Sequence, residues 1–193
     1  MKTKLEGAKR MLVVVDLVKG FVTEGNMADP KIQNIVPESK RLVQEFIQND
    51  DPVLFIKDCH EKNAAEFNRF PVHCVKGTRE AEMVDELKSF ENEVIVFEKN
   101  STSAMFAKNF VNTIDQMEKL EEVVIIGCCT DICVMNLAIP LRNYFDEVNR
   151  DIKIVVPKNA VETYDAPYHA KDEYNVMAFK FMIQAGIEVV NNY

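Results

Sequence analysis

The apolar residues of the chain fall into short continuous runs that alternate with longer segments of helical periodicity. Fully apolar runs rich in β-branched residues are typical of parallel strands buried on both faces. The runs predict six strands, over Leu12–Val15, Val53–Ile56, Val94–Phe97, Val123–Ile126, Ile152–Val156 and Ile187–Val190. The segments between them predict five helices, over Glu38–Gln48, Ala81–Phe90, Ala104–Met117, Asp131–Phe145 and Asp172–Gln184.

This alternation predicts the fold class. Strands that alternate with helices form βαβ units, and hence an α/β fold: a doubly wound, Rossmann-like parallel sheet of about six strands with helices on both faces. We expect one domain over residues 1–193, because a chain of 193 residues suits a single large core. Two segments break the pattern: residues 24–37, a loop with a short helix at Pro30–Val36, and the irregular residues 58–78. Long irregular segments in compact domains are often functional.

Composition narrows the classes of partner. The formal net charge of −8 argues against nucleic acid, because contacts to phosphates require a basic surface. No apolar stretch approaches the ~20 residues that span a bilayer, and none before Met11 is long enough for a signal peptide. We therefore expect a cytoplasmic protein that binds neither nucleic acid nor a membrane and whose five cysteines are free thiols. A homo-oligomer remains open.

The segment Val123–Ile139 carries the strongest chemical signal. A buried strand leads through Gly127 into a helix whose first turn contains Cys133. At the positive end of a helix dipole a thiol has a lowered pKa and favours the nucleophilic thiolate. A strand, a tight turn and a cysteine at a helix start are a common way to present a nucleophile, which makes Cys133 a candidate. The alternative is that cysteines are small apolar core residues, and Cys128 and Cys129, taken alone, fit that role.

Two charged residues follow other predicted strands. Asp16 comes after the first apolar run, and Lys99 comes after the third. The carboxyl ends of parallel strands lie at one edge of the sheet, so Asp16, Lys99 and Cys133 are expected there together. Taken alone, such an aspartate often caps a turn and such a lysine is usually solvated. Together they supply the proton shuttle and the charge stabiliser that a cysteine hydrolase needs. We expect Lys99 to lower the pKa of both other groups.

A second group of polar residues lies in the irregular segment. Asp58 and His60 alternate along an extended stretch and so face one point, and Glu66 and His73 follow them. Two histidines with carboxylates suit Zn²⁺, Mn²⁺ or Fe²⁺. The alternative is that histidines in a polar loop are merely solvated. Two of the three histidines of the chain fall in this segment, which favours a metal site.

The nucleophile segment resembles that of a known family. Its residues Gly127, Thr130, Asp131, Cys133 and Val134 are similar to those of the isochorismatase-like cysteine hydrolases, which include the nicotinamidases and pyrazinamidases. That family pairs the cysteine with an aspartate after the first strand and a lysine after a later one, and Asp16 and Lys99 match both. The resemblance implies an oxyanion hole formed by the backbone N–H groups of Cys129 and Cys133, with a cis peptide between residues 128 and 129.

The irregular segment resembles the nicotinamidase branch of the same family. In that branch an Asp-x-His pair is followed by a Glu or His and then by Phe/Trp-Pro-x-His-Cys and Gly-Thr, and residues 70–78 are FPVHCVKGT. The resemblance implies that Asp58, His60 and His73 bind one divalent transition metal, with Glu66 as a direct or water-mediated fourth ligand. Zn²⁺ is expected first, with Mn²⁺ and Fe²⁺ as alternatives. Metal-free relatives such as the isochorismatases lack this motif.

Three further residues are candidates for the substrate pocket. Phe21 and Phe70 match aromatic positions of nicotinamidases, although ordinary core packing explains each of them equally well. Thr102 stands where many relatives have a tyrosine beside the substrate, which leaves one pocket wall open or filled from elsewhere. His169, before the last helix, is interpreted as a surface or capping residue without a catalytic role.

The resemblance implies an amidohydrolase that acts on a small-molecule amide. The expected reaction converts nicotinamide to nicotinic acid and ammonia through a thioester on Cys133, with pyrazinamide as a surrogate substrate and the metal orienting the pyridine nitrogen. Two alternatives remain open. One is another amidase of the family that acts on a carbamoyl or ureido compound, and the other is a non-catalytic scaffold of the same fold.

Overall fold

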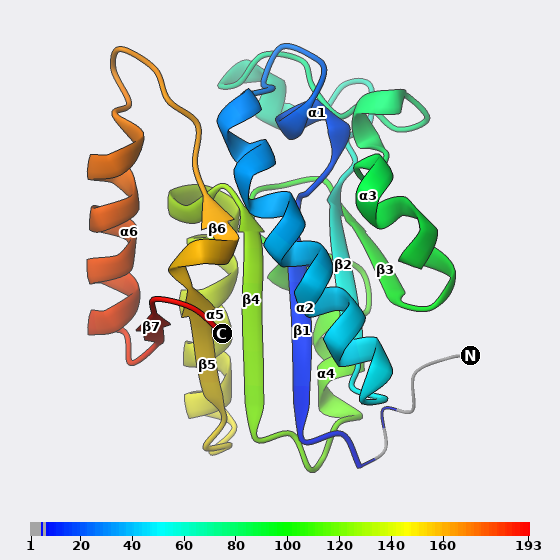
Figure 1. Ribbon diagram of the computed structural model, residues 1–193, viewed down its shortest axis with the longest axis vertical. Coiled ribbons are helices and arrows are strands. Elements are labelled where there is room, and N and C mark those ends of the chain that lie inside the picture. The colour runs from blue at the N-terminus through cyan, green and yellow to red at the C-terminus, as the bar shows by residue number, and fades with distance from the viewer. Residues whose placement is uncertain (1–4, 6) are drawn as a thin grey trace.

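A parallel sheet forms the centre of the computed structural model, which describes residues 5 and 7–193 (Figure 1). Among the described residues the sheet has seven strands: β1 (Arg10–Val15), β2 (Val53–Asp58), β3 (Ile95–Lys99), β4 (Glu122–Cys128), β5 (Lys153–Pro157), β6 (Val161–Glu162) and β7 (Glu188–Val190). The strand order is β3-β2-β1-β4-β5-β7, with β6 paired to the end of β4. The predicted α/β sheet is confirmed, and the two-residue β6 is the strand that the apolar pattern missed.

Helices cover both faces of the sheet (Figure 1). One apolar layer is shared with α1 (Lys19–Val22), α2 (Val36–Gln48) and α3 (Asp85–Lys88). The other layer is shared with α4 (Phe110–Asp115), α5 (Met135–Glu147) and α6 (Lys171–Gln184). This arrangement is the doubly wound architecture that the sequence predicts.

Two of the predicted helices are shorter than expected. The helix expected over Ala104–Met117 divides into a 3₁₀ turn and α4, because Asn109 lies at φ +66°, in the left-handed region that ends a right-handed helix. The helix expected over Ala81–Phe90 begins only at Asp85. The backbone at Val84 is extended, and its N–H donates to the carbonyl of Leu17 instead.

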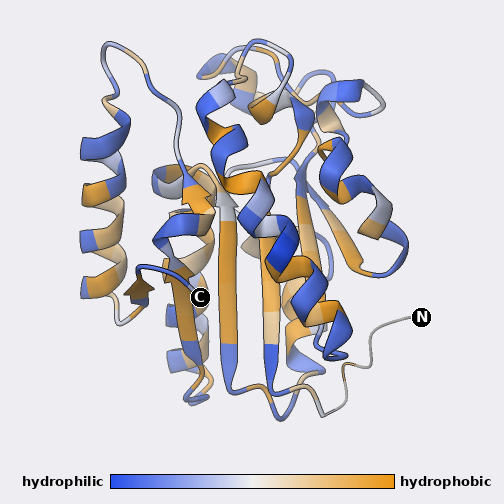
Figure 2. Ribbon diagram, in the orientation of Figure 1, coloured by the Kyte–Doolittle hydropathy of each residue, from blue (hydrophilic) through white to orange (hydrophobic). Residues whose placement is uncertain are grey.

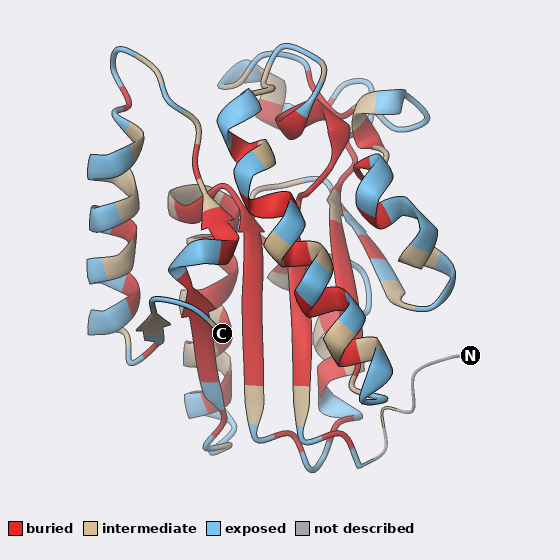
Figure 3. Cartoon of the chain, viewed as in Figure 1, coloured by how far each residue is buried: buried red, intermediate tan, exposed pale blue. Residues whose placement is uncertain are grey.

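The central strands are buried on both faces, as their continuous apolar sequences predict. Along β1, Leu12 and Val14 belong to one apolar layer, while Val13 and Val15 belong to the other. The apolar colouring and the burial of these strands are visible in Figures 2 and 3. Each such fully buried aliphatic side chain contributes roughly 1.5–3 kcal/mol.

From the composition we expect free thiols and no apolar stretch long enough to span a bilayer. The five cysteines are free and all of them are buried. Within the described part of the chain, no helix has the length and apolar character needed to cross a membrane.

The strand order reverses between β1 and β4, and this is where ligand sites form in doubly wound sheets. Gly127 of β4 pairs with Val15 of β1 at the carboxyl edge. Its φ is +116°, and a Cβ there would lie 2.0 Å from the carbonyl oxygen of Val15, so a residue with a side chain would separate the strands. This close approach of β1 and β4 places Asp16, the residue after β1, beside the turn that follows β4.

Candidate active site

Asp16, Lys99 and Cys133 meet at this edge. The Lys99 Nζ lies 2.8 Å from Asp16 Oδ2 and 3.7 Å from Cys133 Sγ. All three residues are buried, with 0%, 3% and 6% of their surface exposed. Asp16 turns the chain out of β1 at φ +52°, a left-handed conformation that short polar residues tolerate. The structure therefore brings together the three residues that the strand order predicts at one edge.

Burial governs protonation in this group. It raises the pKa of the Asp16 carboxyl to about 6, against the lowering effect of Lys99. Burial also raises the pKa of the Cys133 thiol well above its ordinary value, and Lys99 only reduces that shift. Lys99 acts to lower both pKa values, as expected, but lost hydration outweighs its positive charge, so both pKa values lie above their ordinary range. The expectation of a lowered pKa for Cys133 at the helix start is therefore wrong. At neutral pH the arrangement is a neutral thiol beside an ionised carboxylate.

This carboxylate is placed to accept a proton. Both oxygens of Asp16 are buried, and among the described residues neither accepts a hydrogen bond of good geometry, so the Lys99 contact is an ion pair. Burial lowers the pKa of Lys99, but Asp16, Cys133 and Asp58 together raise it well above its ordinary value. Lys99 therefore stays charged, and the Asp16 carboxylate lies close enough to the Cys133 thiol for that thiol to lower its pKa.

Cys133 lies in a π-helical turn, Thr130–Val134, rather than in the first turn of α5. The N–H of Val134 donates to the carbonyl of Cys129, five residues earlier, at 3.1 Å. The peptide between residues 128 and 129 is cis, as the resemblance implied. The oxyanion-hole role of the Cys129 and Cys133 N–H groups stays a prediction.

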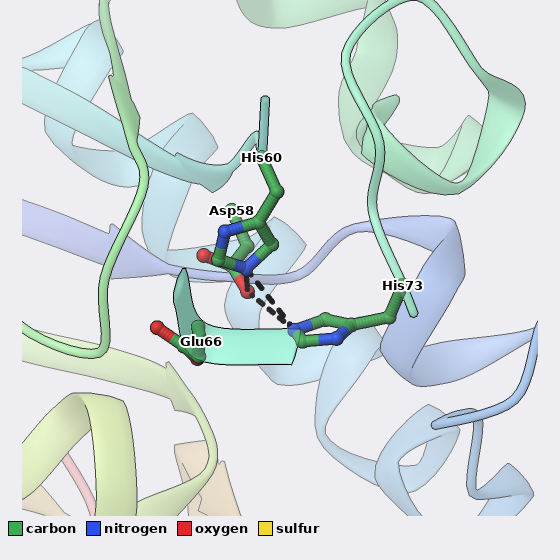
Figure 4. A group of neighbouring side chains, drawn as sticks. All are labelled: Asp58, His60, Glu66 and His73. Carbon is green, nitrogen blue, oxygen red and sulfur yellow. Dashed lines mark hydrogen bonds and ion pairs between the residues drawn. The ribbon is translucent and has the colours of Figure 1, made fainter. Parts of the chain in front are cut away.

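The second group, which we call the His–Asp cluster, consists of Asp58, His60, Glu66 and His73. One ligand atom from each lies within 4.8 Å of the others (Figure 4). The two Nε2 atoms are 3.2 Å apart, and they lie 3.0 Å (His60) and 3.2 Å (His73) from Asp58 Oδ2. All four residues are buried, so the histidines are not the solvated loop residues of the alternative interpretation.

The remaining ring nitrogens show what this cluster can bind. Nδ1 of His73 lies 2.7 Å from the carbonyl oxygen of Pro71, and Nδ1 of His60 lies 3.1 Å from Asn100 Oδ1. An N–H at each Nδ1 satisfies these oxygens and leaves two unprotonated Nε2 atoms facing a carboxylate oxygen. Lone pairs that converge in this way repel one another unless a cation lies between them, so the donor set fits a divalent transition metal.

Asp58 joins the two groups. Its Oδ1 accepts a hydrogen bond from Lys99 at 2.8 Å, while its Oδ2 faces the histidines. Burial raises the pKa of Asp58, but the positive charge of the Lys99 ammonium opposes burial, and the pKa of Asp58 lies far below its ordinary value. Asp58 is therefore ionised, and it contacts both Lys99 of the first group and the histidines of the His–Asp cluster.

Residues of both groups line one pocket, in which Asp58 and Glu66 of the His–Asp cluster lie together with Cys133. Its lining includes Cys133 and His73 together with all three predicted pocket residues, Phe21, Phe70 and Thr102. Tyr164 also lines it, and no sequence signal indicated this residue. Although Thr102 is small, Tyr164 therefore supplies an aromatic side chain to the pocket wall from another part of the chain.

Comparison with known proteins identifies the family. The isochorismatase domain matches residues 10–191. The chain belongs to the isochorismatase family. Nicotinamidase 1 of Arabidopsis thaliana is 34% identical over an alignment of 180 residues that covers 83% of this chain and 72% of that protein. Nicotinamidase PncA from Bacillus subtilis matches with a TM-score of 0.79 at 27% identity, covering 94% of this chain and 99% of that one. N-carbamoylsarcosine amidase from Thermoplasma acidophilum matches with a TM-score of 0.75 at 27% identity, covering 94% and 95%.

These relatives confirm the resemblance of this isochorismatase-family chain to the nicotinamidase branch and support an amidohydrolase activity. One sequence interpretation within the region is wrong. His169 is not a surface residue: only 4% of it is exposed, and its ring is stacked against Tyr164. The ring also hydrogen-bonds to Asp131, 38 residues earlier in the sequence, and local pattern gave no sign of that contact.

Proposed function

We propose that the chain is a cysteine amidohydrolase that converts nicotinamide to nicotinic acid and ammonia, with pyrazinamide as a surrogate substrate. One observation carries the proposal: the buried Cys133 and residues of the His–Asp cluster line the same pocket. A nucleophile beside a transition-metal donor set matches a substrate that has both an amide carbonyl and a ring nitrogen. The aromatic side chains of the pocket suit a flat ring.

Acylation uses Asp16 as the base. Its carboxylate, ionised above pH about 6, accepts the proton of the Cys133 thiol as the sulfur attacks the carbonyl carbon. The Cys129 and Cys133 N–H groups are proposed as donors to the oxyanion. When the C–N bond breaks, Asp16 passes the proton to the leaving nitrogen, so ammonia departs and a thioester remains on Cys133.

In deacylation, water takes the place of the thiol as the nucleophile, and the sulfur becomes the leaving group. Asp16 takes a proton from water as the water oxygen attacks the thioester carbonyl carbon. The C–S bond breaks, the sulfur recovers its proton, and the acid is released. Lys99 holds Asp16 in place throughout and lies 3.7 Å from the sulfur, where it stabilises negative charge that develops on the sulfur.

Asp58, His60 and His73 would hold the metal, proposed as Zn²⁺, with Glu66 as the fourth ligand. When bound, it supplies a Lewis acid for the ring nitrogen of the substrate. The protein's own part is to fix the ligand orientation through the Nδ1 contacts of the two histidines.

The test is ammonia release from nicotinamide, pyrazinamide and benzamide, with elemental analysis of the same sample and Cys133→Ala as the inactive control. Benzamide has the shape of nicotinamide but no ring nitrogen. A site built for a polar group rejects an analogue that lacks it, so nicotinamide and pyrazinamide should exceed benzamide by roughly a hundredfold in kcat/KM. Equal rates for benzamide and nicotinamide in metal-loaded enzyme would refute the proposal.

A second candidate is an amidase that acts on a carbamoyl or ureido compound. The likeness to N-carbamoylsarcosine amidase and the small Thr102 in the pocket favour it. An N-carbamoyl amino acid in the same substrate panel separates the two candidates: a preference for it over nicotinamide would favour the second. The intact group of Asp16, Lys99 and Cys133 argues against a non-catalytic scaffold.

A further inference from the structure

An aromatic stack contacts the turn that carries Cys133. It is formed by the segment between β6 and α6, whose course is visible in Figure 1, and by the first turn of α6. The His169 ring lies between the rings of Tyr164 and Tyr174. Its centroid is 3.8 Å from that of Tyr164, with the planes 10° apart, and 3.6 Å from that of Tyr174, with the planes 28° apart. One of these two tyrosines, Tyr164, lines the substrate pocket.

The edges of the same ring are held by hydrogen bonds. His169 Nδ1 lies 3.0 Å from the carbonyl oxygen of Tyr164, and Nε2 lies 2.9 Å from Asp131 Oδ2. A carboxylate oxygen can only accept, so the hydrogen bond to Asp131 needs an N–H at Nε2 of the ring. The other oxygen of Asp131 accepts a hydrogen bond from the buried Thr163 hydroxyl at 2.5 Å.

Asp131 connects this stack to the nucleophile. It belongs to the π-helical turn Thr130–Val134, two residues before Cys133. Its two carboxylate oxygens are held by His169 and Thr163, both from the segment that follows β5. A carboxylate fixed on both oxygens leaves the turn little freedom to rotate, and small displacements of a reacting group can reduce a rate by roughly a hundredfold.

We propose that His169 is a positioning residue for the amide hydrolysis proposed above: it fixes the Cys133 turn through Asp131 and a wall of the substrate pocket through Tyr164. The hydrogen bond from Nε2–H and the stacking face of the ring have different effects. The hydrogen bond fixes the position of the Cys133 turn through Asp131 and therefore affects kcat. The stacking face fixes the position of Tyr164 in the pocket wall and therefore affects KM. The proposal rests on the proposed amidohydrolase function, but the placement of Cys133 can be measured without turnover.

Two substitutions separate the roles. His169→Phe keeps a flat ring for stacking but removes the donor to Asp131, and His169→Gln keeps a donor that reaches toward Asp131 but removes the ring. We expect His169→Phe to lower kcat roughly tenfold with KM within twofold, because it loses a hydrogen bond to a charged group. We expect His169→Gln to raise KM roughly tenfold with a much smaller change in kcat. Tyr168→Phe, at a residue 79% exposed, is the matched control and should change neither constant.

Cys133 reactivity is the independent measurement. The rate of alkylation by iodoacetamide, with Cys133→Ala as the blank, reports the setting of the thiol whatever the substrate is. We expect His169→Phe to slow alkylation several-fold and His169→Gln to leave it near the wild-type rate. If wild-type enzyme does not hydrolyse nicotinamide, the proposed function fails, while the alkylation rates still decide the role of His169.

Two results would overturn the inference. One is that both variants, with thermal midpoints near that of the wild type, keep kcat, KM and alkylation rate within twofold. The other is that both lose activity in the same proportion as their folded fraction, which would make His169 a packing residue only. If neither variant folds, Thr163→Val decides, because it removes the second hydrogen bond to Asp131 at similar volume. It should lower kcat several-fold at unchanged KM, and an unchanged kcat would reject the inference.

Discussion

Replacing Lys99 with methionine tests the electrostatics of the site most directly. The ammonium lies 2.8 Å from Asp16 and 2.8 Å from Asp58, and all three side chains are at least 98% buried. Lys99→Met keeps the length of the side chain but leaves two buried carboxylates without their cation. Removal of one partner of a buried ion pair costs about 3–5 kcal/mol.

Part of this cost should depend on pH in a calculable way. Lys99 lowers the pKa of Asp16, so in the variant this pKa rises above about 6 and the folded protein holds a proton at pH 7. The unfolded chain releases that proton, because its aspartate titrates near pH 3.9. Stability that depends on a raised pKa is present at low pH and is lost as the pH rises.

One pKa unit corresponds to about 1.4 kcal/mol. The variant should therefore lose about 1.4 kcal/mol more than the wild type for each pH unit above about 6, until the raised pKa is reached. Asp58 loses the same ammonium, so any rise in its own pKa would add to this slope rather than reduce it.

The assay is urea unfolding of wild type and Lys99→Met at pH 6, 7 and 8, with a chelator in every sample so that metal binding does not contribute. Lys76→Met is the matched control, since Lys76 pairs with Glu98 at 2.8 Å on the surface and should change little. Turnover of Lys99→Met at pH 7 should fall at least roughly a hundredfold, because a protonated Asp16 cannot act as the base. A stability difference that is constant from pH 6 to 8, or turnover near that of the wild type, would refute this reasoning.

Three further predictions concern the same site. For the wild type, kcat/KM should fall about tenfold per pH unit below about 6, as Asp16 becomes protonated, and a profile that stays flat down to pH 5 would contradict its role as the base. Cys133→Ala should abolish turnover, and adding Asp16→Asn should cost nothing more because the residues act as a unit, so losses that multiply would count against that unit. His60→Ala should lose the bound metal by elemental analysis while Cys59→Ala keeps it; equal metal in both variants would remove the His–Asp cluster as the metal site.

The parts of the fold that the sequence predicts are those that follow from local pattern. Strands β1, β2, β4 and β5 are buried on both faces, so their apolar runs are continuous and easily recognised. The rule that sites form at the carboxyl edge of such a sheet then placed Asp16, Lys99 and Cys133 together without any knowledge of distances. Helix ends were less predictable, because the break at Asn109 depends on a backbone angle that this residue type permits but does not require.

The sequence pattern could not predict the protonation states of the site residues or the contacts of His169 and Tyr164 beside the pocket. The position of Cys133 near a helix start suggested a thiolate, but the depth of burial decides its pKa, and spacing along the chain carries no measure of depth. His169 and Tyr164 lie in an irregular segment whose contacts are with a turn much earlier in the sequence. Such contacts come from tertiary packing, so no periodicity records them.

The convergence of four strand ends on one pocket has a consequence for folding kinetics. Asp16, Asp58, Lys99 and Cys133 come from the ends of β1, β2 and β3 and from the turn after β4, so every contact among them joins distant parts of the chain. Contacts of high sequence separation form slowly, because the entropy of closing long loops opposes them. The pocket should therefore appear only when the four central strands have assembled, after α2 and α5 have acquired helical structure. During refolding from urea, the return of amidase activity should lag behind the return of helical circular dichroism, and that interval measures the time the chain needs to complete its central sheet.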